Sequence, residues 1–385
     1  MNDNMKVCRL GIWDNTIPGI RFDQAGISNY AHIQKKMMAD FPRGNSGQKD
    51  WDKIVKSIRE KRGKKEYDCI VGVSGGTDSS YLLHILKKYE LRPLAVNLDN
   101  GWSSEIAVAN IKKMTQQLGI DLETYVIDYE EIKDLMRCYM FASVPWIDAP
   151  TDLAIHSILY LIAKKERVNY IFVGQDFRSE GKQPTEWTYS DQKQLKYFHK
   201  QHGRVKLKSF PLVSLWKLFY FGYIKKIKLI PVFSFIDHQK KYAQEFLKKK
   251  YNWCYYGEHH HENLFSKFAI GHWQYKKFGI DKRIITYSAQ ILSGEISRND
   301  AIQEVENAPY KAEDLKNDLN YILNKLELSK EEYNRIWYSP NCSFKDYPSY
   351  YPIFVKLYKY VWPIVSKIVP TKPKIFYEFD ERSKD

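Results

Sequence analysis

The chain has 385 residues, which predicts two domains or one large core with additions. The hydrophobic fraction is 44%, enough to bury a sizeable core. The five cysteines form no C-x-x-C pair, which argues against a disulfide scaffold and favours a reducing compartment. Lys and Arg number 60 against 46 Asp and Glu, and the net charge of +14 favours anionic partners: nucleotides, nucleic acid or acidic lipid.

The first ten residues contain no apolar segment of the kind found in secretory signals, and no apolar run is long enough to span a bilayer. We therefore expect a cytoplasmic protein. Residues 1–33 are rich in turn-forming residues, and a helix is expected over about 51–62.

From residue 67 onward, short apolar runs alternate with amphipathic segments. Strands are expected at 69–73, 94–98, 122–127 and 170–173, and helices at about 77–89, 104–118 and 151–167. Ser103 or Ser104 is a suitable N-cap for the second of these helices, and Gly119 is a suitable stop. The alternation predicts an α/β fold with a doubly wound parallel sheet, in which ligands bind beyond the carboxyl ends of the strands.

After about residue 190 the alternation stops, and 239–335 is expected to be mostly helical. The last fifty residues are rich in Tyr, Pro and Lys and are expected to form an extended arm, since Pro352 and Pro363 limit any helix there to fewer than twelve residues. The expected organisation has four parts: an N-terminal segment (1–50), an α/β domain (51–200), a mainly helical region (201–335) and the aromatic basic tail (336–385).

The most informative motif is Ser74-Gly75-Gly76-Thr77-Asp78-Ser79, between the first expected strand and the first helix after it. The glycines permit a tight turn with outward-facing backbone N–H groups, and the helix N-terminus favours an anion. The motif is neither a Walker A loop nor a G-x-G-x-x-G dinucleotide fingerprint. Asp78 beside a phosphate cradle predicts a bridging Mg²⁺.

This loop resembles the PP-loop of the N-type ATP pyrophosphatases. That group activates a carbonyl or carboxyl oxygen by adenylation and releases pyrophosphate. The resemblance implies that the chain uses ATP and Mg²⁺.

Further motifs are similar to those of the N-acetyl sugar amidotransferases of bacterial surface-polysaccharide (lipopolysaccharide) synthesis. They lie at 97–111, 148–152, 174–187 with Asp191, 253–263, 277–283 and 292–298. The resemblance extends to about residue 335, and these motifs together are far more specific than the loop alone.

The resemblance also implies roles for individual residues. The ATP phosphates would be held by Ser74, Gly75, Gly76, Thr77, Asp78 and Ser79, with Asp99 near the adenosine or a metal, and Gly174, Gln175 and Asp176 on the opposite wall. The sugar would face Glu180, Trp187, Glu258, His260 and Glu262. Lys277, Lys282 and Arg283 would neutralise the pyrophosphate, and we expect Asp78, Lys277 and Arg283 to be catalytic. A structural or surface role is at least as common for any single residue outside the loop.

The N-terminus departs from the family, whose members often begin with two cysteine pairs resembling a zinc knuckle. The corresponding positions here are Cys8, Gly11, Ser28 and Ala31. Tetrahedral zinc needs four ligands, so no zinc is expected at this degenerate knuckle. The run 259–261 of three histidines is a poor substitute, because consecutive side chains point in different directions.

The implied reaction is ATP-dependent adenylation of the N-acetyl oxygen of a sugar, which we expect to be nucleotide-linked. Ammonia then displaces AMP to give an acetamidino group. The chain shows no glutaminase motif, and the resemblance implies that a separate glutaminase and a channel partner supply the ammonia.

Three alternatives remain. A PP-loop tRNA-modifying enzyme would suit the positive charge, but sulfur transfer in that class usually needs paired cysteines. A lysidine-type RNA enzyme is left open, but the downstream motifs do not support it, so we expect no nucleic-acid partner. A non-catalytic ATP-binding scaffold is disfavoured by the intact loop. The C-terminal tail, rich in Tyr, Trp and Lys, is either packed on the protein or in peripheral contact with the inner face of a membrane.

Overall fold

The computed structural model describes residues 5–255, 262–366 and 371–383. In this part of the chain, five parallel strands form one sheet in the order β3-β2-β1-β4-β5. The strands are β1 (Cys69–Gly72), β2 (Pro93–Asp99), β3 (Asp121–Val126), β4 (Tyr170–Val173) and β5 (Lys228–Pro231). The expected α/β class with a doubly wound parallel sheet is confirmed. The direction of winding reverses between β1 and β4, which is where such sheets bind ligands.

β5 was not expected, because the sequence analysis ended the alternation near residue 190. The strand pairs in parallel with β4, with Tyr170 opposite Lys228 and Val173 opposite Pro231. A four-residue strand at the edge of a sheet has too few residues to show a clear periodicity. The sheet therefore extends beyond the expected domain boundary at residue 200.

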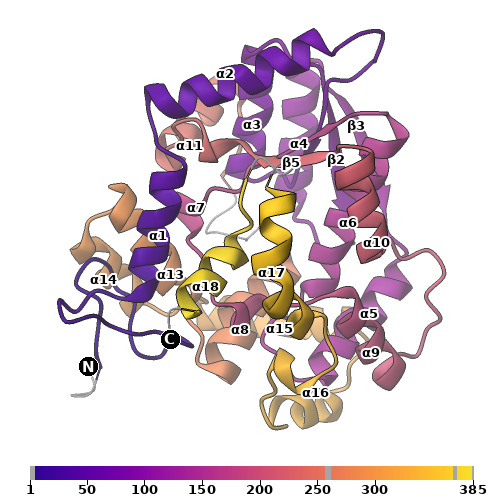
Figure 1. The fold of residues 1–385 in the computed structure, drawn as a ribbon. Coiled ribbons are helices and arrows are strands. Elements are labelled where there is room, and N and C mark those ends of the chain that lie inside the picture. Colours follow the sequence, from indigo (N-terminus) through magenta and orange to yellow (C-terminus); the bar gives the residue numbers. More distant parts are fainter. Residues whose placement is uncertain (1–4, 256–261, 367–370, 384–385) are drawn as a thin grey trace.

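Helices cover both faces of the sheet (Figure 1). One face is covered by α2 (Asn45–Glu60), α3 (Thr77–Lys88), α4 (Glu105–Leu118) and α11 (Lys240–Tyr251), and the other by α6 (Ala149–Lys165) and the π-helix η1 (Tyr220–Ile224). Trp51 and Leu86 are completely buried on the first face. As expected, Ser104 caps α4, accepting a hydrogen bond from the Ala107 N–H, and Gly119 ends the helix with φ of 57°.

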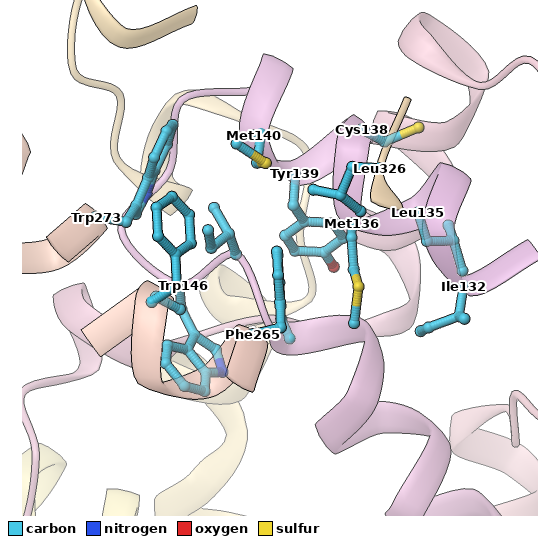
Figure 2. Close-up of a cluster of buried hydrophobic side chains, with 14 of the residues drawn as sticks. Ile132, Leu135, Met136, Cys138, Tyr139, Met140, Trp146, Phe265, Trp273 and Leu326 are labelled. Atoms are coloured by element: carbon cyan, nitrogen blue, oxygen red, sulfur yellow. The ribbon is translucent and has the colours of Figure 1, made fainter. Parts of the chain in front are cut away.

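A second, mainly helical core lies beyond one end of the sheet, as the sequence predicted for the region after residue 239. Its elements are α5 (Tyr129–Phe141), α9 (Gln192–His202), α12 (Leu264–Phe268), the π-helix η3 (Ala269–Lys277), α15 (Ala312–Lys325) and α16 (Lys330–Trp337). Figure 2 shows α5 side chains such as Tyr139 and Met136 packed with Phe265, Trp273 and Leu326. This core fixes the segment after residue 262 against the carboxyl ends of the strands.

Residues 5–28 of the N-terminal segment form a compact knuckle. Cys8 is completely buried, and its Sγ accepts a hydrogen bond from the Ser28 N–H at 3.2 Å. Ala31 lies in the same apolar cluster, and a Cβ at Gly11 would lie 2.7 Å from the Trp13 ring. Packing of Trp13 therefore fills the knuckle. The knuckle is followed by α1 (Asn29–Asp40), and it packs near α13 (Lys282–Ser293), which precedes α14 (Arg298–Glu306).

The tail is not an extended arm: it forms α17 (Tyr351–Val365) and α18 (Lys374–Arg382). The expected limit on helix length is wrong. Pro352 lies in the first turn of α17, where its missing N–H has no intrahelical partner, and Pro363 interrupts the helix only two residues before its end. α18 packs on α1, and its Glu378 bonds Lys182 and Thr185 of the body. Among the described residues, no helix is both long and apolar enough to cross a bilayer.

Candidate active site

A cavity of about 430 Å³ opens at the carboxyl ends of β1, β2 and β4, where the winding of the sheet reverses. Its floor carries Ser74 and Gly76 after β1, Asn97 and Asn100 around the end of β2, and Gly174 after β4. A Cβ at Gly174 would lie 3.0 Å from the Asp78 backbone. The glycine therefore allows the two loops to approach each other closely.

The loop after β1 is a tight turn that leads directly into α3. Gly75 has φ of +79°, and a Cβ there would lie 2.2 Å from the carbonyl oxygen of Ala107 in α4. The Ser74 N–H donates to Ser79 Oγ at 3.2 Å, and the Gly76 N–H donates to Ser74 Oγ at 3.3 Å. The first turn of α3 thus meets the cavity with its backbone N–H groups and hydroxyls, an arrangement suited to binding phosphate.

Two side chains from other elements hold this loop from behind. The carbonyl oxygen of Gly75 accepts hydrogen bonds from Asn110 Nδ2 at 3.3 Å and from Trp253 Nε1 at 3.2 Å. Asn110 also bonds the backbone N–H and carbonyl of Cys254, at 2.9 and 2.8 Å. The loop is therefore fixed before any ligand binds. These contacts could not be predicted from the sequence, because they join positions 35 and 178 residues apart.

Asp78 is held in place by a buried histidine. His238 Nε2 lies 2.8 Å from Asp78 Oδ1, and Lys240 Nζ lies 4.0 Å from Asp78 Oδ2. The imidazole of His238 is stacked on Phe233, with ring centroids 4.0 Å apart, and on Tyr81. His238 lies in the loop before α11, with no periodic pattern around it, so the sequence analysis did not identify it.

The acidic groups near Asp78 fit a Mg²⁺ ion carried by ATP. Glu262 lies on the same cavity wall, and burial raises its pKa to about 6. Mg²⁺ bound with a nucleotide needs only one or two carboxylates, since phosphates and water supply the other ligands. No cluster of three or more metal-binding side chains occurs among the described residues.

A second group of polar side chains lies on the wall opposite the loop. Asp148 and Asp152 come from the start of α6, and Lys282 begins α13. Lys282 Nζ lies 4.5 Å from the centroid of the Trp146 ring, and Trp146 Nε1 donates to Asp152 Oδ2 at 2.7 Å. The Ser266 hydroxyl donates to Asp148 Oδ2. We name these five residues the acid–lysine cluster.

Two residues of the acid–lysine cluster, Asp148 and Lys282, have pKa values near neutrality. Burial, reinforced by the charge of Asp152, raises the pKa of Asp148 to about 7. Burial lowers the pKa of Lys282 to about 8, although Asp152, Glu180 and Asp148 oppose the shift. Burial also raises the pKa of Asp152, which still meets water because it faces the open space of the cavity. Such groups can exchange protons near pH 7, as general acids and bases must.

A larger cavity of about 1060 Å³ adjoins the first. The two cavities share Gln175, Glu180, Thr188, Lys240 and Lys282. The basic residues around the larger cavity are Lys182, Lys240, Lys241, Lys267, Lys282, Arg283 and Lys374, and its acidic residues are Glu180, Glu295 and Glu304. The excess of positive charge favours an anionic ligand beside the phosphate loop.

Most of the residues expected to bind ATP lie around the first cavity. Its lining includes Ser74, Gly76, Thr77, Asp78, Ser79, Gly174 and Gln175, together with Glu180 and Glu262 from the expected sugar site. Gly75 faces α4 instead. Asp99 is the last residue of β2, and its Oδ1 accepts from the Gly101 N–H at 2.9 Å, so it caps a turn and lies outside the lining.

Other expected site residues lie elsewhere. Lys277 Nζ donates to the carbonyl oxygens of Trp337 and Ser339 at 2.7 and 2.8 Å, away from both cavities, which corrects the catalytic role expected for it. Trp187 is buried in the N-terminal apolar cluster. Glu258 and His260 lie outside the described residues.

Arg283 lines the larger cavity but not the first. Its guanidinium forms a bidentate pair with Asp281, with Nη2 to Oδ2 at 2.7 Å, and donates to the carbonyl of Glu304 at 2.9 Å. Asp176, expected beside Gln175, is completely buried and caps α7 (Phe177–Glu180), so it shapes the wall from behind.

The parallel sheet with its switch-point cavity defines an α/β protein with a glycine-rich loop at the edge of the sheet where ligands bind. Residues 262–361 of the chain match the family model described as "LPS biosynthesis protein WbpG-like, C-terminal domain". This match confirms the expected resemblance to proteins of lipopolysaccharide synthesis. An uncharacterized protein of Methanocaldococcus jannaschii is 33% identical over 92 residues, covering 24% of this chain and 32% of the relative. The chain thus spans about a third of that relative's length.

Three solved structures to which the chain is similar are distant in sequence. NMN synthetase from Francisella tularensis is 14% identical, with a TM-score of 0.34, covering 81% of this chain and 99% of the other. The U34-tRNA thiolase NcsA from Methanococcus maripaludis is 15% identical, with a TM-score of 0.31, covering 75% and 86%. The NH3-dependent NAD synthetase from Campylobacter jejuni is 14% identical, with a TM-score of 0.26, covering 45% and 72%.

Proposed function

We propose that the chain is an ATP-dependent amidotransferase that converts the N-acetyl group of a nucleotide-linked sugar into an acetamidino group, releasing AMP and pyrophosphate. The observation that carries the proposal is the continuity of two cavities: one contains the phosphate loop, and the other is larger and mainly basic. The match of residues 262–361 to a protein of lipopolysaccharide synthesis supports a sugar substrate.

The chemistry requires two displacements. The N-acetyl oxygen attacks the α-phosphorus of ATP, and pyrophosphate leaves. Ammonia then attacks the activated carbon, loses a proton, and AMP leaves with the former acetyl oxygen. Bound Mg²⁺ would stabilise the charge on the leaving pyrophosphate.

The described residues divide these tasks between two walls. On the loop side, Ser74, Thr77 and the N-terminus of α3 bind phosphate oxygens, while His238 keeps Asp78 in one orientation. On the opposite wall, the acid–lysine cluster holds a proton acceptor near neutral pKa. Lys282 in its neutral form takes the proton from the attacking ammonia, and Asp148 and Asp152 stabilise the resulting ammonium.

Ammonia delivery belongs to the same proposal. A separate glutaminase and channel partner would supply ammonia, so the isolated chain should use ammonium salts but not glutamine. Glutamine-dependent turnover by the pure chain would contradict this part without affecting the adenylation step.

The decisive experiment uses a nucleotide-linked N-acetyl sugar carrying ¹⁸O in the acetyl carbonyl. The protein is incubated with Mg-ATP and ammonium, and the products are separated by mass spectrometry. We expect one AMP per amidine formed, with the ¹⁸O in AMP. ADP as the nucleotide product, or ¹⁸O retained in the sugar, would refute the mechanism. AMP formation stimulated only by RNA would support a tRNA-modifying enzyme instead.

A further inference from the structure

A ten-residue helical segment presents an aromatic surface to solvent. It consists of α10 (Leu215–Phe219) continued by η1. Five large side chains point outward at helical spacing: Trp216, Phe219, Tyr220, Tyr223 and Ile224. Trp216 is 83% exposed and Ile224 is 57% exposed. We call these five residues the aromatic face.

The inner side of the same segment is also apolar and already packed. Phe221 is 2% exposed and stacks on Tyr160 of α6, with ring centroids 6.1 Å apart and planes at 8°. On the outer side, the rings of Phe219 and Tyr223 stack on each other at 5.2 Å. A helix that is apolar on all sides is normally buried on all sides, so the aromatic face is suited to a further contact.

The charged residues in the sequence around the aromatic face are all basic. From residue 192 to residue 236 the sequence contains ten Lys and Arg and no Asp or Glu. Lys217, Lys225 and Lys226 are exposed on or beside the segment. Lys225 Nζ lies 5.6 Å from the centroid of the Tyr220 ring. The surface that would bind here therefore carries negative charge.

We infer that the aromatic face, with its flanking lysines, attaches the protein to the surface of an anionic lipid membrane. Trp and Tyr rings favour the boundary between headgroups and acyl chains, and lysines favour anionic headgroups. Ten residues are too few to span a bilayer, so the attachment would be peripheral. A second copy of this chain is a poor partner, because a two-fold contact would bring lysines opposite lysines.

The test is co-sedimentation of the full chain with vesicles of phosphatidylglycerol and phosphatidylcholine, compared with phosphatidylcholine alone. We expect binding to the anionic vesicles that weakens with salt. Trp216→Ser with Phe219→Ser should abolish it. Lys225→Glu with Lys226→Glu should weaken it by at least about 30-fold, because each lysine near an anionic surface contributes roughly a fivefold factor and reversal adds repulsion.

Matched control variants test whether the loss of any exposed ring, or of any two exposed lysines, weakens vesicle binding. Tyr338→Ser removes another highly exposed ring, and Lys53→Glu with Lys56→Glu reverses two exposed charges on α2. Both should bind as the unchanged chain does. Leu357→Ser with Tyr360→Ser tests the exposed side of α17, which was expected from the sequence to contact a membrane.

Three results would overturn the inference: no binding to anionic vesicles, binding that survives the changes at Trp216 and Phe219, or loss of binding only in the α17 variant. A fourth is a dimer in size-exclusion chromatography that dissociates when Trp216 and Phe219 are replaced, since the aromatic face would then be a contact between copies. All variants should retain the helical circular dichroism of the unchanged chain.

Discussion

At the scale of single residues, His238 orients the carboxylate of Asp78, although the two residues lie far apart in the sequence. Asp78 belongs to the recognisable loop, but the group that fixes its carboxylate lies 160 residues further along the chain. Both nitrogens of His238 are shielded from solvent, and Nδ1 has no hydrogen-bond partner among the described residues. The histidine is therefore buried chiefly for its contact with Asp78.

Replacing His238 with Phe tests this role. His238→Phe preserves the stack on Phe233 but removes the Asp78 contact, so we expect an approximately tenfold weaker affinity for Mg-ATP, the effect of losing one hydrogen bond to a charged group. Isothermal titration calorimetry measures the affinity. Tyr251→Phe is the control, because it removes the contact of Tyr251 with His84, at 2.7 Å, outside both cavities. Equal affinity in both variants would contradict an orienting role.

Asp148 predicts a pH effect with a definite sign. Its pKa in the folded protein is about 7, above the value near 3.9 in an unfolded chain. The folded state thus retains the proton longer, and stability falls as pH rises from about 4 to about 7. Asp148→Asn should remove this slope, gaining up to about 3 kcal/mol relative to the unchanged chain between pH 5 and pH 7.

Urea unfolding at several pH values measures the effect of Asp148→Asn. The exposed Asp300→Asn is the control and should follow the unchanged chain. Parallel pH profiles for Asp148→Asn and the unchanged chain would show that Asp148 is not buried as described. The variant should also lose amidine formation if the acid–lysine cluster acts as proposed.

At this scale the contiguous loop motif could be predicted from the sequence, whereas the hydrogen bonds that Asn110, Trp253 and His238 make to it could not. The loop serines and Asp78 follow an apolar strand directly, so their position could be inferred. Lys277 and Lys282 lie in one motif, but the first ends η3 and points back to α16, whereas the second begins α13 and faces the cavity. The turn between them reverses the direction of the side chains, which spacing alone does not show.

At the scale of elements, the loop after β1 depends on close contact with α4. Gly75→Ala would place a methyl group 2.2 Å from the Ala107 carbonyl oxygen, so we expect loss of measurable ATP binding and a lower melting temperature. Gly119→Ala is a matched control: its φ is also positive, at +57°, but no atom lies within 4 Å. This control should cost only about 1–2 kcal/mol and keep ATP binding. If both variants lost ATP binding to the same extent, the loss would come from backbone strain at a positive φ and not from the contact with α4.

The elements that sequence patterns missed have identifiable physical features. In α5, charged residues are buried on several sides: Glu131 accepts from the Ser209 N–H, and Arg137 donates to the carbonyls of Leu326 and Glu327. Because hydrogen-bonded charged residues occupy buried positions of this helix, its sequence lacks the apolar periodicity by which a helix is recognised. α4, by contrast, has a regular apolar stripe and clear caps, and its bounds were predicted closely.

At the scale of the whole molecule, α18 is fixed to the body by a buried ion pair. Lys182 is 9% exposed and Glu378 is 1% exposed. The ammonium of Lys182 contacts the Glu378 carboxylate, which also accepts from Thr185 Oγ1. The C-terminal segment is therefore part of the core rather than an appended tail.

Breaking this pair should destabilise the whole protein. Glu378→Gln leaves the buried Lys182 ammonium without its counter-charge, which typically costs about 3–5 kcal/mol. Urea denaturation should show this loss, while Lys36→Ala, which removes a partly exposed pair with Asp380, should change the free energy of unfolding by less than about 1 kcal/mol. A small effect of Glu378→Gln would indicate that α18 can detach without unfolding the body.

The walls of the two cavities are assembled from segments as far apart as Gly72 and Ile375. During synthesis on a ribosome, the phosphate loop is made early, whereas Lys282 follows some two hundred residues later and Lys374 later still. A nascent chain therefore cannot bring the loop, the acid–lysine cluster and the basic cavity together until the segment that contains Ile375 has emerged. Under the proposed function, nucleotide turnover would therefore begin only after both cavities have formed.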